Sequence, residues 1–345
     1  MKQMRMLVQT APGKLEIQQV ACPQPGPGEI LMRVHYCGIC GTDLMNYRGQ
    51  YVWGRDSFPK FPGHEASGVV EALGEGVNHF KIGDRILPEC TIGCGVCEWC
   101  KAGNYSLCRN RMKTSNGAMA DYLTVPAKGV LKLPDSLELL EGALIEPVAV
   151  GASAALKCGS IFGKSVGVIG AGTIGLGSLE TFHVLGAAKS FVFDLAEPRL
   201  KLAEKLGATR GVNPSRVDPI NAVHEATRGA GLDRVVVASA GTAATVGLAL
   251  KLVAPLGVIS IVGLSGGQLS EIDADEISEK EVTVIGSHSS PGVWEDLLAC
   301  AAAGRYDLKS LVSHILPLEE AERAFQLLDT SSEPAHKVVL SMVEG

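Results

Sequence analysis

A glycine-rich turn between an apolar strand and a helix is the feature that most restricts how this chain can fold. Gly170-Ala171-Gly172-Thr173-Ile174-Gly175 directly follows a predicted strand at Ser165–Ile169 and opens a predicted helix at Thr173–Leu185. In such a turn the first glycine permits a sharp bend, the second lets backbone approach a pyrophosphate, and the third allows close helix packing. The helix N-terminus then offers free N–H groups to the phosphates.

Beyond this turn, continuous apolar runs alternate with helical segments. Strands that are buried on both faces have this composition, and their alternation with helices is typical of a parallel sheet covered on both sides. The predicted fold class is therefore α/β, with a doubly wound, Rossmann-type sheet. Further strands are predicted at Ser190–Phe193, Arg234–Ala238, Val258–Val262 and Val282–Ile285, and further helices at Pro198–Leu206 and Ala243–Leu252.

An acidic residue stands where the ribose of a dinucleotide is expected. Asp194 follows the second strand, nineteen residues after Gly175. A carboxylate there accepts hydrogen bonds from a ribose diol and repels a 2′-phosphate, which favours NAD over NADP. With strand, turn, helix and acid in register, we predict an NAD site rather than a glycine-rich turn between buried elements.

The first 150 residues have a different, β-rich texture. Short β-forming runs are interrupted by Gly, Pro and Asp, as in a domain of strands and tight turns. After about residue 288 the pattern is mixed. The predicted strands are Glu29–Val34, Ser67–Val70, Ala120–Val125 and Lys337–Ser341, and the predicted helices are Trp294–Ala303 and Leu318–Leu328.

Four of the ten cysteines fall within fifteen residues. Their spacing predicts a closed four-thiolate zinc site, which leaves no position open for chemistry. An iron–sulfur cluster is the competing interpretation, but its common spacings differ from this one. Cys22, Cys37, Cys90, Cys158 and Cys300 lack ligand spacing, and we expect them to be small buried residues. The clustered cysteines are Cys94, Cys97, Cys100 and Cys108.

A second group of possible metal ligands is dispersed. Cys40 is followed by Thr42, then by His64-Glu65, and much later by Glu146. One thiolate, one imidazole and one carboxylate can form an open three-ligand zinc site with a fourth position for substrate or water. Spacing alone leaves the alternative that these residues are unrelated surface and core positions.

Taken together and in this order, these motifs resemble the zinc-containing medium-chain alcohol dehydrogenases, and most closely their polyol (sorbitol-like) and threonine dehydrogenase branch. The resemblance spans essentially the whole chain. It implies a GroES-like β-rich catalytic domain formed by residues 1–150 and 288–345, with a Rossmann NAD-binding domain of residues 151–287 inserted between them. It also implies two zinc ions per chain, one structural and one catalytic, and a homo-oligomer, either a tetramer or a dimer.

The resemblance also assigns roles to individual residues. The catalytic metal ligands look like Cys40, His64 and Glu65. Glu146 resembles a second carboxylate near the metal, at a position where ethanol-type relatives have cysteine and the threonine branch is expected to have aspartate. Arg199 is expected to pack near the adenine of NAD.

The implied reaction is oxidation of a secondary alcohol, with zinc as Lewis acid and hydride transfer to the nicotinamide. Thr42 would take the alcohol proton. Met45 stands where many relatives carry a histidine that ends the proton relay, so water, or a group such as His35 or Asp43, must complete the path; we favour water.

The substrate is expected to be a small alcohol, either a polyol or a polyol phosphate. L-threonine 3-dehydrogenase is the first alternative, and a non-catalytic zinc- and nucleotide-binding regulatory protein is the second. Pocket residues are expected in the stretch 45–60, including Tyr47, Trp53 and Phe58. Arg48, Arg55 and Lys60 could meet a phosphate, although we favour solvated loop charges.

The net charge of −6 argues against nucleic acid and anionic membranes as partners. Apolar runs are too short to cross a bilayer, which needs about 20 residues, and the N-terminal segment has no apolar signal core. We therefore expect a cytoplasmic enzyme.

Overall fold

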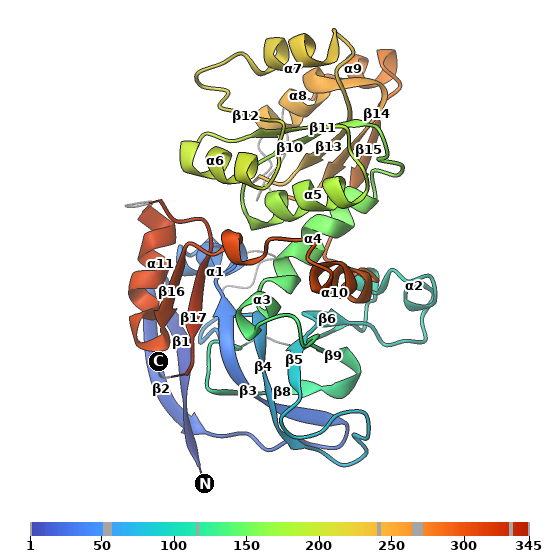
Figure 1. Cartoon of the computed structure of the whole chain (residues 1–345). Helices are drawn as coiled ribbons and strands as arrows, with labels where there is room; N and C mark the ends of the chain where they lie inside the picture. Colours follow the sequence, from blue (N-terminus) through green and yellow to red (C-terminus); the bar gives the residue numbers. More distant parts are fainter. Residues whose placement is uncertain are drawn as a thin grey trace. The chain divides into compact units, whose positions relative to one another are not determined.

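The structure is a computed structural model that describes residues 2–50, 57–114, 117–239, 243–263, 272–330 and 334–343. The chain forms two compact units (Figure 1). The domain limits at residues 150 and 287 stay predictions. Unit 1 contains Met1–Glu146, Trp294–Gly304 and Leu308–Gly345, and unit 2 contains Pro147–Val293 and Arg305–Asp307.

Unit 2 is built on a six-stranded parallel sheet with the strand order β12-β11-β10-β13-β14-β15. Its central strands are almost entirely buried, because helices cover both faces. The predicted α/β class is therefore confirmed. The strands are β10 (Ser165–Ile169), β11 (Lys189–Phe193), β12 (Arg210–Val212), β13 (Leu232–Val237), β14 (Val253–Ile261) and β15 (Thr283–Gly286).

Helices α5 and α6 lie on one face of this sheet, and α7 and α8 lie on the other (Figure 1). The predicted helices after the glycine turn and after Asp194 occur as α5 and α6. Helix α4 begins with the last residues of unit 1 and continues into unit 2. The helices are α4 (Ile145–Leu156), α5 (Thr173–Val184), α6 (Glu197–Lys205), α7 (Pro219–Thr227), α8 (Ala243–Leu252) and α9 (Ala274–Glu279).

Unit 1 contains a seven-stranded sheet in the order β16-β17-β3-β4-β5-β9, with β8 also paired to β3. It also contains two two-stranded sheets, β1-β2 and β6-β7. Its core is an apolar cluster that includes Ile30, Met32 and Phe325. The strands are β1 (Gln3–Ala11), β2 (Lys14–Ala21), β3 (Glu29–Gly38), β4 (Glu65–Leu73), β5 (Arg85–Pro88), β6 (Thr91–Ile92), β7 (Met112–Lys113), β8 (Tyr122–Pro126), β9 (Val130–Lys132), β16 (His314–Pro317) and β17 (Val338–Ser341).

The C-terminal segment completes this sheet, as predicted from the strand at Lys337–Ser341. Strand β17 pairs antiparallel with β3, with Val339 opposite Gly38. The predicted helix at Leu318–Leu328 is a short 3-10 turn, η5 (Leu318–Glu320), followed by an α-helix. The remaining helices of the unit are α1 (Gly41–Tyr47), α2 (Glu98–Lys101), η2 (Tyr105–Leu107), η3 (Ala127–Gly129), α3 (Leu139–Gly142), α10 (Trp294–Ala302), η4 (Lys309–Leu311) and α11 (Ala321–Thr330).

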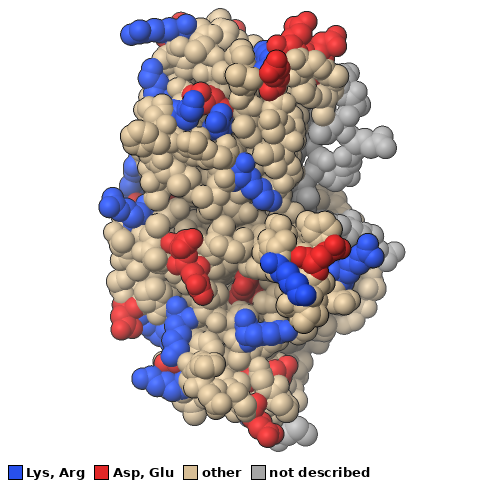
Figure 2. All heavy atoms as spheres, turned by 90° about the vertical axis from the view of Figure 1, so that its right-hand side faces the viewer, with Lys and Arg blue, Asp and Glu red and all other residues tan. Residues whose placement is uncertain are grey.

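Within the described ranges, no helix combines the length and the apolar character needed to cross a membrane. On the face drawn in Figure 2, basic and acidic side chains are interspersed, and no basic stripe crosses the part of that face that is described. This mixture of both signs accords with the modest net charge of −6.

Candidate metal and cofactor sites

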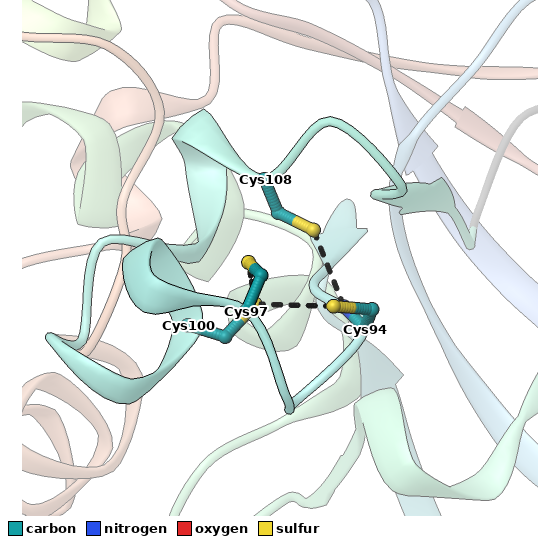
Figure 3. Close-up of side chains that lie close together, drawn as sticks. All are labelled: Cys94, Cys97, Cys100 and Cys108. Atoms are coloured by element: carbon teal, nitrogen blue, oxygen red, sulfur yellow. Dashed lines mark hydrogen bonds between the residues drawn. The ribbon is translucent and has the colours of Figure 1, made fainter.

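The four clustered cysteines converge on one point of unit 1 (Figure 3). Cys94 follows β6, Cys97 is the N-cap of α2, Cys100 lies within α2, and Cys108 is the C-cap of η2. All four sulfur atoms lie within 4.8 Å of one another. The Sγ atoms of Cys97 and Cys100 are 3.5 Å apart, and those of Cys94 and Cys100 are 4.0 Å apart. A tetrahedral zinc site with bonds of about 2.3 Å places its sulfurs about 3.8 Å apart, so the group fits zinc.

The local backbone prepares this group for a metal. A Cβ at Gly93 would lie 2.4 Å from the Sγ of Cys100, so only glycine lets the loop close over the sulfurs. Backbone N–H groups of Val96 and Cys97 donate to the Cys94 thiol and lower its pKa to about 6. A thiolate is the form that binds zinc, so at least this sulfur is ready for a metal at neutral pH.

The dispersed residues also come together within unit 1. The ligand atoms of Cys40, His64 and Glu65 lie within 4.8 Å of one another. Asp43 holds the two loops in place, because its carboxylate accepts hydrogen bonds from the backbone N–H groups of Cys40 (3.0 Å) and Gly63 (3.2 Å). Each oxygen of Asp43 thus accepts one positioning hydrogen bond, and a part for Asp43 in the proton relay stays a prediction.

Gly63 makes the turn that presents His64 and Glu65. Its φ of +95° lies in the left-handed region, and a Cβ there would meet the backbone N of Met119 at 2.8 Å. Only glycine combines this conformation with this close approach. Burial disfavours the protonated form of His64, but the neighbouring Cys40 and Cys90 outweigh burial and raise the pKa of the imidazole well above its usual value.

A buried ion pair, which the sequence analysis missed, adjoins this group. The ammonium of Lys337 donates to the carboxylate of Glu65 and to the carbonyl of Ile39 at 3.0 Å. The side chains of Lys337 and Glu65 are only 4% and 1% exposed. A Cβ at Gly38 would lie 2.2 Å from a carboxylate oxygen of Glu65, so glycine makes room for the pair. Burial disfavours the charge on Lys337, but Glu65 outweighs it and raises the pKa of the ammonium.

A second three-residue group shares His64. The ligand atoms of His64, Cys90 and Glu146 also lie within 4.8 Å of one another. Burial raises the pKa of Glu146 to about 7, although the charge of His64 opposes this shift. The expectation that Cys90 is a small buried residue is wrong, because its side chain is partly exposed and adjoins possible metal ligands. Cys22, Cys37 and Cys158 are buried as expected, whereas the same expectation for Cys300 is wrong because this residue is partly exposed.

Thr42 and Met45 lie on α1, and both side chains are half-buried. Thr42 is two residues beyond Cys40, in the first turn of this helix. Tyr47, in contrast, belongs to the core, where its ring packs 5.3 Å from that of Phe325. Core packing accounts for the burial of Tyr47, and its place in a substrate pocket stays a prediction.

Arg48 and Lys60, two cations of the stretch 45–60, have partners within the chain. Arg48 pairs with Asp329, and the ammonium of Lys60 donates to Asn46 at 3.2 Å. These contacts favour a structural role for both cations over recognition of a phosphate. Trp53 and Arg55 lie outside the described residues.

In unit 2 the glycine-rich turn has the geometry that its pattern predicts. Gly170 has a φ of +101°, and a Cβ on it would lie 2.6 Å from the backbone N of Ser239. A Cβ at Gly175 would lie 1.9 Å from the carbonyl oxygen of Gly170, whereas one at Gly172 would meet no atom within 4 Å. No side chain caps the N-terminus of α5. Thr173 and Ile174, in its first turn, therefore adjoin space and N–H donors that suit a pyrophosphate.

Asp194 lies beside this turn, at the end of β11. Its carboxylate accepts hydrogen bonds from the backbone N–H groups of Ala171 (2.7 Å) and Ala196 (2.9 Å). Each carboxylate oxygen has a second lone pair, so the group can still accept hydrogen bonds from a ligand. Arg199 lies in the first turn of α6 and is half-buried. The residues at this turn fit a dinucleotide.

Known proteins share these features. Residues 26–135 match the alcohol dehydrogenase GroES-like domain, and residues 173–303 match the zinc-binding dehydrogenase family. The chain is 33% identical over 329 residues to sorbitol dehydrogenase of Macaca fascicularis, with 93% of this chain and 91% of that protein covered. It is 32% identical over 320 residues to L-threonine 3-dehydrogenase of Caldanaerobacter subterraneus, with 91% and 92% covered.

A solved structure of a dehydrogenase has the same fold as this chain. The chain superposes with a TM-score of 0.94 on an Escherichia coli oxidoreductase/dehydrogenase of unknown specificity, at 33% identity over 99% of this chain and 100% of that one. The fold and the metal-binding residues thus define a zinc-binding dehydrogenase. The chain belongs to the zinc-containing medium-chain alcohol dehydrogenases, in the branch with the polyol and threonine dehydrogenases. It is an oxidoreductase, which argues against the alternative of a non-catalytic regulatory protein.

Proposed function

We propose that this enzyme oxidises a secondary alcohol of a polyol or polyol-phosphate-like substrate and transfers the hydride to NAD. The observation that carries the proposal is the convergence of Cys40, His64 and Glu65, which are dispersed in sequence but close in unit 1. A thiolate, an imidazole and a carboxylate form an open zinc site that leaves one position for substrate. Zinc, when bound, supplies a Lewis acid that makes an alcohol more acidic.

The chain's own residues would hold and deprotonate the substrate. Asp43 fixes the loops that carry Cys40 and His64 through its two backbone hydrogen bonds. Thr42 follows Cys40 in the same helix, and its hydroxyl can accept one hydrogen bond while donating another. We assign it the first proton transfer from the alcohol. Met45 cannot exchange a proton, so we assign the rest of the path to water, with His35 and Asp43 as the alternatives.

NAD is proposed as the cofactor because Asp194 adjoins the glycine turn. Its negative charge would oppose the 2′-phosphate of NADP, and its free lone pairs suit the ribose hydroxyls of NAD. Gly170, Gly172 and Gly175 would admit the pyrophosphate. Arg199 would pack near the adenine.

A neutral polyol is favoured over a phosphorylated one. The described cations of the stretch 45–60, Arg48 and Lys60, already contact Asp329 and Asn46. L-threonine 3-dehydrogenase is the second candidate, supported by the 32% identical relative. Glu146 weighs against it, because the threonine branch is expected to carry aspartate at this position.

The decisive experiment is a substrate panel of polyols, polyol phosphates and L-threonine, with NAD reduction followed by absorbance. The expected result is turnover of at least one polyol that exceeds turnover of threonine in kcat/KM. Cys40→Ser should abolish turnover, whereas Cys300→Ser, on α10, serves as the matched control and should retain it. Turnover of threonine alone would select the second candidate, and full activity of Cys40→Ser would overturn the site assignment.

Two zinc ions per chain, a cytoplasmic location and assembly into a tetramer or dimer belong to the same proposal. Metal analysis of freshly purified protein should find two zinc ions. Light scattering should give a multiple of the 36.1 kDa chain mass. A single metal ion per chain would contradict the separate structural and catalytic sites.

A further inference from the structure

The strongest unexplained feature is the second group around His64. Cys90 lies between β5 and β6, twenty-six positions after His64 in the sequence, and Glu146 lies in the first turn of α4. The three ligand atoms are within 4.8 Å of one another. In a tetrahedral zinc site, ligand atoms about 2.0–2.3 Å from the metal lie about 3.3–3.8 Å apart. Small side-chain rotations are therefore enough to bring all three onto one ion.

Within the group of His64, Cys90 and Glu146, the carboxylate of Glu146 is the side chain that a cation would stabilise most. Its side chain is 8% exposed. No hydrogen bond is seen to its carboxylate among the residues that the structure describes, although the charges of His64 and Lys337 act on it. Glu65, by contrast, is already compensated by Lys337. A buried carboxylate with few hydrogen-bond donors is stabilised by a nearby cation, and a bound metal ion would supply one.

Cys90 is held where it can serve as the thiolate of this group. Its carbonyl accepts a hydrogen bond from the backbone N–H of Thr114 at 3.1 Å, and the preceding Glu89 donates to Gly129 at 2.8 Å. The hydroxyl of Thr91 lies 3.9 Å from the Cys90 sulfur and donates to it. The backbone is thus anchored on both sides, and the sulfur already acts as an acceptor. Thiolate is a ligand that zinc binds well.

We propose that Cys90 is a ligand of the catalytic zinc, in a second three-ligand position that shares His64 with the first and is completed by Glu146. The metal then has two overlapping positions, one with the Cys40 thiolate and one with the Cys90 thiolate. Each position has three protein ligands and one open site. The proposal rests on the catalytic metal of the proposed function, but its test does not require turnover.

The test uses full-length enzyme in which zinc fills the four-cysteine site and Co²⁺ replaces the catalytic zinc, with one of each confirmed by metal analysis. Cobalt bound to thiolate shows a sulfur-to-metal charge-transfer band, so the spectrum reports whether a cysteine is bound. If Cys90 is a ligand, Cys40→Ser keeps one Co²⁺ and retains this band. Cys40→Ser/Cys90→Ser loses it, whereas the matched control Cys40→Ser/Cys300→Ser keeps it.

Loss of the band in Cys40→Ser alone, with Co²⁺ still bound, would overturn the proposal. A variant that keeps Cys40 covers the case in which the Cys40 variants do not fold. Cys90→Ser should weaken Co²⁺ binding at least about 10-fold, because changes even to outer partners of a metal site weaken binding about 10–100-fold. Affinity equal to that of Cys300→Ser would also overturn it. Failure of the substrate panel leaves these spectra unaffected, so the two proposals fail separately.

Discussion

Replacing Asp194 with serine should reduce the preference of the enzyme for NAD. The carboxylate lies at the glycine turn, where it accepts hydrogen bonds from Ala171 and Ala196 and keeps further lone pairs for a ribose. A hydrogen bond to a charged group contributes about 1.5–3 kcal/mol. Losing one such bond to NAD corresponds to about a 10–150-fold drop in kcat/KM.

The negative charge of Asp194 should also repel the 2′-phosphate of NADP. Two unit charges 4 Å apart interact by about 4 kcal/mol at an effective dielectric constant of 20. Because Asp194 is half-buried, solvent reduces this repulsion to about 1–2 kcal/mol. Together, the hydrogen bond and the repulsion amount to about 2.5–5 kcal/mol, or a preference for NAD of about 60-fold or more, since every 1.4 kcal/mol is a factor of ten.

The assay is kcat/KM with NAD and with NADP for the unmodified enzyme, Asp194→Ser and Asp194→Asn. Asparagine removes the charge but keeps an acceptor oxygen for one of the two backbone N–H groups, so comparison with serine helps to separate repulsion from hydrogen bonding. We expect Asp194→Asn to gain activity with NADP while losing less with NAD than Asp194→Ser. An unmodified enzyme that uses NADP as well as NAD, or a ratio that changes less than about twofold in Asp194→Ser, would refute the reasoning.

Three further predictions concern stability and proton transfer. Cys97→Ser should lower the zinc content by one ion per chain. It should also lower the thermal unfolding temperature, because a closed site contributes folding energy. An unchanged zinc content and unfolding temperature would contradict a structural zinc. Thr42→Ala should lower kcat about 10²–10⁴-fold while NAD binding by titration stays intact, and a loss within about twofold at every pH would remove Thr42 from the relay. Burial raises the pKa of Glu180 from 4.5 to about 7. Between these two pH values the folded chain therefore binds more protons than the unfolded chain. The free energy of unfolding should fall by up to about 3 kcal/mol as pH rises through this range. Glu180→Gln, which keeps an acceptor for the N–H of Asp307, should remove this fall in thermal scans between pH 5 and 8; an identical pH dependence in both proteins would show that Glu180 is not responsible.

Local patterns made the Rossmann sheet and the four-cysteine site predictable. The glycine turn, its strand and its helix lie within about twenty consecutive residues, and Gly170 and Gly175 have the steric reasons that the pattern implies. The four cysteines need only a short loop to meet. Strand β12, with three residues, was not predicted, because so short a run carries no detectable period.

Contacts between distant segments were not predictable. Lys337 lies 272 positions from Glu65, and a lysine beside a strand is normally expected to face solvent. Cys90 has no ligand at a motif spacing, so only the folded sheet reveals its position beside His64. The packing of Tyr47 on Phe325 was not predicted, because Phe325 comes from the C-terminal segment.

The buried pair of Glu65 and Lys337 shows why the C-terminal segment belongs to the catalytic unit. The register of β17 on β3 sets Val339 opposite Gly38, and this pairing delivers the preceding Lys337 to the metal group. A buried ion pair adds little net stability, because desolvation offsets the attraction, so its value lies in geometry. One oxygen of Glu65 is fixed by the ammonium, which orients the carboxylate as a whole. The other oxygen remains for the metal position beside Cys40, and the balance between the two proposed positions therefore depends on how firmly Lys337 holds Glu65.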